Sequence, residues 1–232
     1  MKQQAYYSQS GFALAWVAVL AILAGTVSVT LVNVLQSQQG LGVVVQTRSN
    51  IERVADAIKA FQRVNGILPC PSSLTIAQAT AGFGVARDKV SGPPSNVCNI
   101  GTGGAGDGSG STVNTVVLSP GAARVGAVPT RTLGLPDEVG QDKWGSRLMY
   151  AVVENKTRPA DYATAVNNLS INRNGSPVMS NLAFIVFSQG QDKAGAYSLV
   201  TGKAVRPCNG SDNCNNDRVF EYEDPDLIMG FD

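Results

Sequence analysis

The sequence of 232 residues predicts an α+β protein, in which a long N-terminal helix packs against a small antiparallel sheet. Three observations lead to this fold class. An uncharged, apolar stretch from Phe12 to Leu35 is long enough for a helix that crosses a bilayer. An amphipathic helical pattern follows it. Short β-rich runs separated by turn residues then fill the C-terminal half of the chain.

The apolar stretch follows a polar leader, residues 1–11, which ends at Gly11. A secretory signal peptide would have a basic N-terminal region and a small-residue exit. Here Lys2 is the only basic residue before the span, and the apolar run continues past its "LAG". We therefore expect residues 12–35 to remain as a transmembrane or assembly helix, in which small residues such as Gly25 let a neighbouring helix approach closely. An uncleaved plain anchor stays open.

Residues 36–66 are expected to continue the helix with one apolar face. In "TRSNIERVADAIKAFQRVNG" apolar residues recur three and four positions apart, and charged residues occupy the opposite face. Asn65 and Gly66 tolerate the left-handed backbone that ends a helix, and Pro69 prevents its continuation. The apolar face is expected to pack on the domain that follows.

Residues 67–232 are expected to form one globular domain. The chain is predicted to be loop-like from Leu68 to Gly126, with a Gly-rich surface insertion at residues 99–112. Strands are predicted from the runs "TVVLS", "RLMYAVV", "LAFIVFS", "AYSLV" and "RVFEYE".

The composition excludes several functional classes. The chain has no histidine, which removes Ser-His-Asp and Cys-His catalysis and all imidazole metal sites. A formal net charge of +1 provides no basic field for nucleic acid. Gly101–Gly106 spells the dinucleotide fingerprint, but no strand precedes it and no helix follows it. Clustered carboxylates such as Asp137, Glu138 and Asp142 are interpreted as solvated loop charge. We expect no enzyme, although carboxylate-only glycosidase chemistry stays open.

The four cysteines indicate disulfides in an oxidising compartment, because their number is even and they lie beyond the apolar segment. They form no C-x-x-C pair, which disfavours zinc and thioredoxin-like sites. Of the three pairings, Cys70–Cys98 and Cys208–Cys214 are favoured because each closes a local loop rich in Gly, Asn and Ser. Four free thiols in a cytosolic protein are the alternative.

The leader that ends at Gly11, followed by Phe12 and an apolar stretch, resembles the class III signal of type IV prepilins and type II secretion pseudopilins. Later segments are similar, in the expected order, to a group of proteobacterial prepilin-type proteins. These segments are "AIKAFQRVNGILPCP", "VPTRTLGLPDEVGQDKWGSRLMYAV", "FIVFSQGQDKAGA" and the terminal "DPDLIMGFD". Together they cover most of the chain outside the Gly-rich insertion.

The resemblance implies a pilin-like fold and a structural role in a type IV pilus or a type II secretion pseudopilus. A prepilin peptidase would cut after Gly11 and methylate the amine of Phe12. The chain would be stored as a single-pass protein of the inner membrane, with its C-terminal domain in the periplasm. It would then join other pilin or pseudopilin subunits in a filament. Asp142, Trp144 and Gly145 would hold the turn before a sheet strand.

One position departs from the family pattern. The family usually has Glu at the fifth mature position, where its carboxylate is thought to meet the N-terminal amine of a neighbouring subunit. Here that position is Trp16. The departure implies a minor, tip or initiator subunit rather than a repeating shaft subunit. The alternative is that Trp16 is an ordinary lipid-facing or interfacial aromatic.

Two other functions use the same anchor and stay open. One is a membrane-anchored periplasmic enzyme or ligand-binding module, and the other is an adhesin-like tip protein that exposes the Gly-rich insertion. The resemblance also allows a calcium ion near the C-terminus, where Asp192, Asp212 and Asp217 lie without an assigned ligand set. No other cofactor is expected.

Overall fold

The computed structural model describes residues 42, 44–86, 98, 123–206, 219–221 and 228–231. The chain divides into two compact units, Met1–Gly42 and Val43–Asp232, and nearly all described residues belong to the second. The predicted transmembrane helix, the Gly-rich insertion and the "TVVLS" strand lie outside these ranges. Within them, no helix combines the length and the apolar character needed to cross a membrane.

A long helix, described at residue 42 and over residues 44–65, carries the predicted amphipathic pattern. Its apolar stripe of Ile51, Val54, Ala55 and Ile58 is buried. The helix ends as its sequence predicts, because Gly66 adopts a left-handed φ of 69° and its N–H donates to Gln62 O over 2.8 Å. The prediction of an amphipathic helix is therefore confirmed for this part of residues 36–66.

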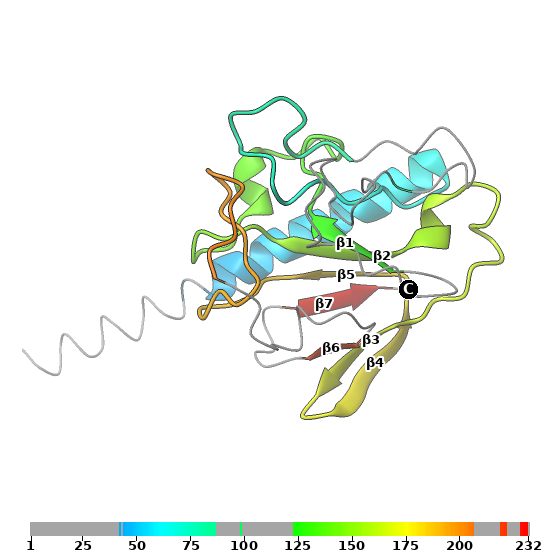
Figure 1. Ribbon diagram of the computed structural model, residues 1–232. Helices are drawn as coiled ribbons and strands as arrows, with labels where there is room; N and C mark the ends of the chain where they lie inside the picture. Colours follow the sequence, from blue (N-terminus) through cyan, green and yellow to red (C-terminus); the bar gives the residue numbers. More distant parts are fainter. Residues whose placement is uncertain are drawn as a thin grey trace, which may run out of the picture. The chain divides into compact units, whose positions relative to one another are not determined.

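The helix lies across one face of a four-stranded antiparallel sheet (Figure 1). The strand order is β1-β2-β5-β7, with bounds Ala123–Ala127, Met149–Val153, Phe184–Phe187 and Ile228–Phe231. Successive side chains of a strand point to opposite faces. Tyr150 and Phe184 therefore join the core under the helix, whereas Ala151 and Ile185 join a second core on the other face. The α+β class is confirmed.

A three-stranded sheet of order β4-β3-β6 covers the second core, with Ile171 of β3 packed in it. Its strands are Leu169–Arg173, Ser176–Leu182 and Val219–Glu221 for β3, β4 and β6. β3 and β4 form a hairpin whose turn, Asn174–Gly175, has both φ angles positive, as a two-residue turn requires. β3 and β6 pair in parallel, which the predicted small antiparallel sheet did not include.

Two sequence predictions were wrong. The segment from Leu68 to Gly126, predicted to be a loop, contains most of β1. The backbone of Ser72 lies so close to β1 that a Cβ on Gly126 would be 2.6 Å from Ser72 O. The run "AYSLV" is not a strand but part of a loop held by the isolated bridges Tyr197–Ala204 and Ser146–Ser198. The runs "RLMYAVV", "LAFIVFS" and "RVFEYE" do contain strands, namely β2, β5 and β6.

Candidate functional site

A tight turn, residues 141–147, connects the short 3-10 helix η1 (Asp137–Gly140) to strand β2. Asp142 organises this turn, and its side chain is buried. Its Oδ1 accepts hydrogen bonds from Ser146 N over 2.8 Å and Trp144 N over 3.0 Å. Its Oδ2 accepts one from Ser188 Oγ over 2.6 Å. Asp142 thus ties the turn to the chain after β5.

Gly145 completes the turn with a φ of 88°, a conformation in which a side chain would be strained. The predicted structural role of Asp142, Trp144 and Gly145 therefore agrees with the geometry. The interpretation of Asp142 as a solvated carboxylate was wrong, because its carboxylate is enclosed and used as a hydrogen-bond acceptor. Asp137 does remain at the surface, where it pairs with Arg131.

Burial raises the pKa of the Asp142 carboxyl above its ordinary value. The hydrogen bonds from Ser188, Ser146 and Trp144 oppose this rise because they favour the charged form, and so does the positive charge of Lys193. The net direction is upward. The site therefore holds an acid that is easier to protonate than a carboxyl in water.

The turn is attached directly to the start of the helix. Asn50 Nδ2 donates to Gln141 O over 2.9 Å, and Lys143 N donates to Thr47 Oγ1 over 3.2 Å. Both helix residues are buried. These contacts join residues more than ninety positions apart in sequence. They fix the N-terminal part of the described helix to the turn that Asp142 shapes.

Arg147, the last residue of the turn, is fully buried and binds three carbonyl oxygens on two loop segments. Its Nη1 donates to Ser73 O over 2.6 Å, and its Nη2 donates to Ile76 O and to Leu199 O. The guanidinium lies 4.6 Å from the centre of the Phe83 ring. Burial lowers the pKa of Arg147 to about 10. The side chain remains a cation at neutral pH and is held by carbonyl oxygens.

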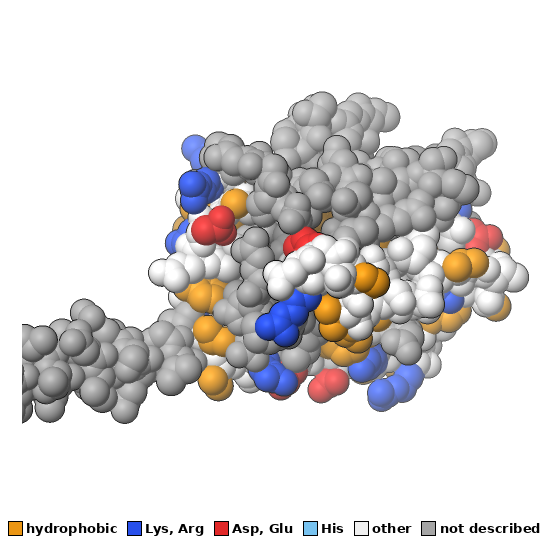
Figure 2. Space-filling view, turned by 90° about the horizontal axis from the view of Figure 1, so that it is seen from below, with side chains coloured by type: hydrophobic (Ala, Val, Ile, Leu, Met, Phe, Trp, Pro, Cys, Tyr) orange, Lys and Arg blue, Asp and Glu red, His pale blue; other side chains and the backbone are white. Residues whose placement is uncertain are grey.

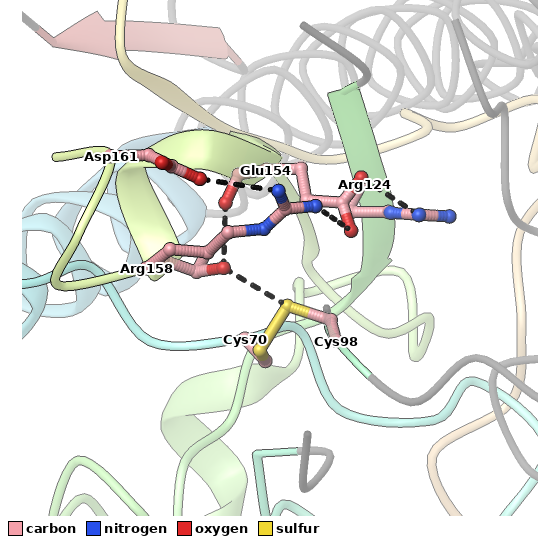
Figure 3. A network of polar contacts seen from close by, with 7 residues as sticks. Cys70, Cys98, Arg124, Glu154, Arg158 and Asp161 are labelled. Atoms are coloured by element: carbon pink, nitrogen blue, oxygen red, sulfur yellow. Dashed lines mark hydrogen bonds and ion pairs between the residues drawn. A yellow bond between two sulfur atoms is a disulfide. The ribbon is translucent and has the colours of Figure 1, made fainter. Parts of the chain in front are cut away.

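A second buried polar cluster adjoins the disulfide (Figure 3). Glu154, the first residue of the 3-10 helix η2 (Glu154–Thr157), pairs with Arg124 of β1 over 2.7 Å and with Arg158 over 3.1 Å. Arg158 also reaches Asp161 over 3.2 Å. Because Arg124 and Glu154 are almost completely enclosed, removal of either would leave an uncompensated buried charge. The cluster therefore holds β1, η2 and the residues that follow η2 together.

The disulfide joins Cys70 to Cys98, as the sequence analysis favours. Thr157 of η2 lies 3.4 Å from the Cys98 sulfur and donates to Glu154 O over 2.7 Å. The disulfide thus rests against the helical turn that carries the Glu154 ion pairs. Cys208 and Cys214 lie outside the described residues, and their pairing stays a prediction.

The residues expected to act in processing and assembly also lie outside the described ranges. They are Gly11, Phe12, Trp16 and Gly25. Within the described part of the chain, no group of three or more Cys, Asp or Glu side chains lies close enough to hold a metal ion. Asp192 is exposed there and accepts a hydrogen bond from Ala194 N, whereas Asp212 and Asp217 are not described.

Sequence reasoning missed several residues that hold the site together. Asn50 and Thr47 belong to a helix whose pattern reveals only its apolar stripe, and their partners lie far away in sequence. Arg147 begins a β-rich run, where a charged residue is expected at the surface. Neither its burial nor the pairing of Glu154 with Arg124 has a local signal. Comparison with protein-family models, curated proteins and solved structures finds no match for the chain.

Proposed function

We propose that this protein is a structural subunit of a type IV pilus or a type II secretion pseudopilus, cut by a prepilin peptidase after Gly11. It is stored in the inner membrane with its C-terminal domain in the periplasm, and its mature N-terminal segment then packs with other subunits in a filament. The proposal rests first on the resemblance of the leader and of the later segments to that family.

One structural observation supports this function most directly. The helix of residues 44–65 follows the apolar segment Phe12–Leu35 in sequence and packs its whole apolar stripe on an antiparallel sheet. A subunit that assembles through an N-terminal helix needs such a firm connection between helix and domain. The contacts of Asn50 and Thr47 with the Asp142 turn supply it at the helix start.

The Cys70–Cys98 disulfide supports the proposed compartment. Disulfides persist in oxidising environments such as the periplasm and are rare in the cytosol. The bond therefore agrees with a domain that has been exported across the membrane.

Trp16 adds to the proposal that the subunit is a minor, tip or initiator one. A buried Glu at this position would be costly in lipid unless a neighbouring subunit paired with it. A subunit with Trp there lacks this contact and suits a place that is not repeated along the shaft.

The proposal is tested by analysing the N-terminus of the protein purified from membranes of cells with an active prepilin peptidase. We expect a chain that starts at N-methylated Phe12, and a Gly11→Ala variant that stays uncut because the peptidase requires glycine before the cut. Ser10→Ala serves as the control and should be processed normally. An intact Met1 terminus in the protein of natural sequence would contradict the proposal. Counting subunits per filament then separates tip from shaft.

A further inference from the structure

One end of the described domain carries both cations and exposed apolar side chains. We name it the helix-start surface, after the point where the described helix starts, and it consists of the first described helical turn with Val45, the turn at residues 141–147, and the loop of residues 192–206. Figure 1 shows these three segments together at the end where the described part of the helix starts, with the loop in orange. Figure 2 shows hydrophobic and basic side chains at the same end of the domain.

Hydrogen bonds hold the three segments in one surface. Lys143 N donates to Thr47 Oγ1, which places the turn beside the helix start. Arg147 N donates to Tyr197 O over 2.8 Å, and Ser198 N donates to Lys203 O over 2.9 Å, which places the loop beside the turn. The surface is therefore a fixed part of the fold.

Several apolar side chains of this surface are exposed. Val45 and Val200 are each 65% exposed, and Val205 is 45% exposed. Trp144 is half-buried on the turn that Asp142 fixes. Tryptophan is enriched where a protein meets the boundary between lipid and water, because its ring is apolar and its N–H is polar.

Basic side chains outnumber acidic ones among the described residues of this end, even with the buried Asp142, which faces the charge of Lys193. Among the described residues of the surface, Lys143, Lys193, Lys203 and Arg206 stand against the exposed carboxylate Asp192. Arg206 also contacts the backbone of Asp192, because its Nη1 donates to Asp192 O over 3.3 Å. Cations beside exposed apolar groups match a bilayer with anionic headgroups, which attracts Lys and Arg and accepts apolar side chains.

The position of the surface in the chain favours a bilayer over another occupant. In sequence, only the eight residues 36–43 separate Val44, the first residue of the continuously described helix, from the apolar segment that ends at Leu35. Eight residues reach at most about 28 Å even when fully extended. If residues 12–35 span the membrane, this end of the domain stays near the headgroups.

We propose that the helix-start surface docks on anionic lipid headgroups while the protein is stored in the membrane. The inference rests on the proposed function, because it requires the apolar segment to be a membrane span. Trp144 and the exposed valines enter the interface, and the lysines and Arg206 meet lipid phosphates.

The test uses the full chain with Trp16→Phe, which leaves Trp144 as the only tryptophan. It is incorporated in nanodiscs of phosphatidylcholine, with or without phosphatidylglycerol. With phosphatidylglycerol we expect Trp144 emission to shift to shorter wavelength, brominated lipids to quench it, and salt to reverse both effects. Lys143→Gln with Lys203→Gln should lower the docking constant roughly 30-fold, since each cation near an anionic surface contributes about fivefold.

The matched control removes the same charge from the exposed helix residues Arg53 and Arg63, which lie further along the helix, and should leave the emission unchanged. Equal Trp144 emission in both lipids, or equal effects of the two variant pairs, would overturn the inference. A shift of Trp144 emission to shorter wavelength that appears only after other subunits are added would also overturn the inference, in favour of a protein partner. Failure of the chain to enter nanodiscs would instead refute the proposed membrane span and with it the proposed function.

Discussion

At the scale of single residues, Asp142 shows how one buried carboxylate can shape a turn. Its two oxygens accept three hydrogen bonds, two from backbone amides of its own turn and one from Ser188. Loss of the side chain would leave buried donors without an acceptor, at about 1–3 kcal/mol for each group. The same carboxylate is the proposed support of Trp144, since it fixes the backbone on which the ring is carried.

We predict that Asp142→Ala destabilises the domain by about 3 kcal/mol or more, whereas Asp142→Asn costs less because its Oδ1 still accepts both amides. Urea unfolding monitored by circular dichroism measures both values. Asp137→Asn, on the exposed Arg131 pair, is the control and should change the unfolding free energy by less than about 1 kcal/mol. Equal losses for Asp142→Ala and Asp137→Asn would contradict the assigned role.

The pH dependence of Asp142 has a definite sign. Its pKa is raised above the ordinary value of 3.8, so the folded state binds this proton more tightly than the unfolded state. The stabilisation from this group is complete below pH 3.8 and is lost as pH rises through the folded pKa. The free energy of unfolding of the natural protein, relative to that of Asp142→Asn, should therefore fall as pH rises from 3.8 through the folded pKa of Asp142.

At the scale of elements, the contact between helix and turn decides how firmly the helix start is held. Asn50 and Thr47 bond to the turn, while the apolar stripe from Ile51 onward packs on the sheet. The polar contacts therefore extend the attachment by about one helical turn beyond the apolar one.

We predict that Asn50→Ala loosens the helix over residues 44–50, because Gln141 O loses its donor. Hydrogen exchange of residues 44–50 should become roughly tenfold faster, which corresponds to about 1.4 kcal/mol, and exchange around Ile58 should stay unchanged. Arg53→Ala, on the exposed face of the same helix, is the control. Unchanged exchange in Asn50→Ala would show that the apolar stripe alone holds the helix start.

The sequence reveals the elements that carry strong local patterns. Helix 44–65 has a complete apolar stripe and a Gly66 stop, and β2 and β5 are continuous apolar runs because both of their faces are covered. β1 carries Gly126 and the ion-paired Arg124, so its sequence has a weak propensity for strand. The strand forms because it pairs with β2. β4 is exposed along most of its length and β7 contains Gly230, so neither shows a clear alternation.

The site was predictable only where one short segment contains it. The Asp142–Gly145 turn is contiguous, and the resemblance identifies it before any fold is known. The Asn50 contact and the three carbonyl partners of Arg147 depend on chain segments that only the fold brings together. A pattern within a window of twenty residues contains no information about such partners.

At the scale of the whole domain, the disulfide restricts the unfolded chain. It joins cysteines 28 positions apart, which corresponds to about 3.5 kcal/mol in the chain-entropy account. We predict that Cys70→Ser with Cys98→Ser lowers the midpoint of thermal unfolding by roughly 7–14 °C. Differential scanning calorimetry under oxidising conditions measures it, with Ser180→Ala on the exposed strand β4 as a small-residue control. A midpoint equal to that of the natural protein would contradict the prediction.

The position of this disulfide also bears on the order in which an exported chain matures. Both of its cysteines precede β1 at Ala123, so if the domain is exported as proposed they leave the translocation channel before any described strand of either sheet. An oxidase on the far side can therefore close the bond while the strands are still being threaded through. When η2 follows, Thr157 packs against a disulfide that is already closed. The last strands then complete a domain whose N-terminal part is already covalently linked.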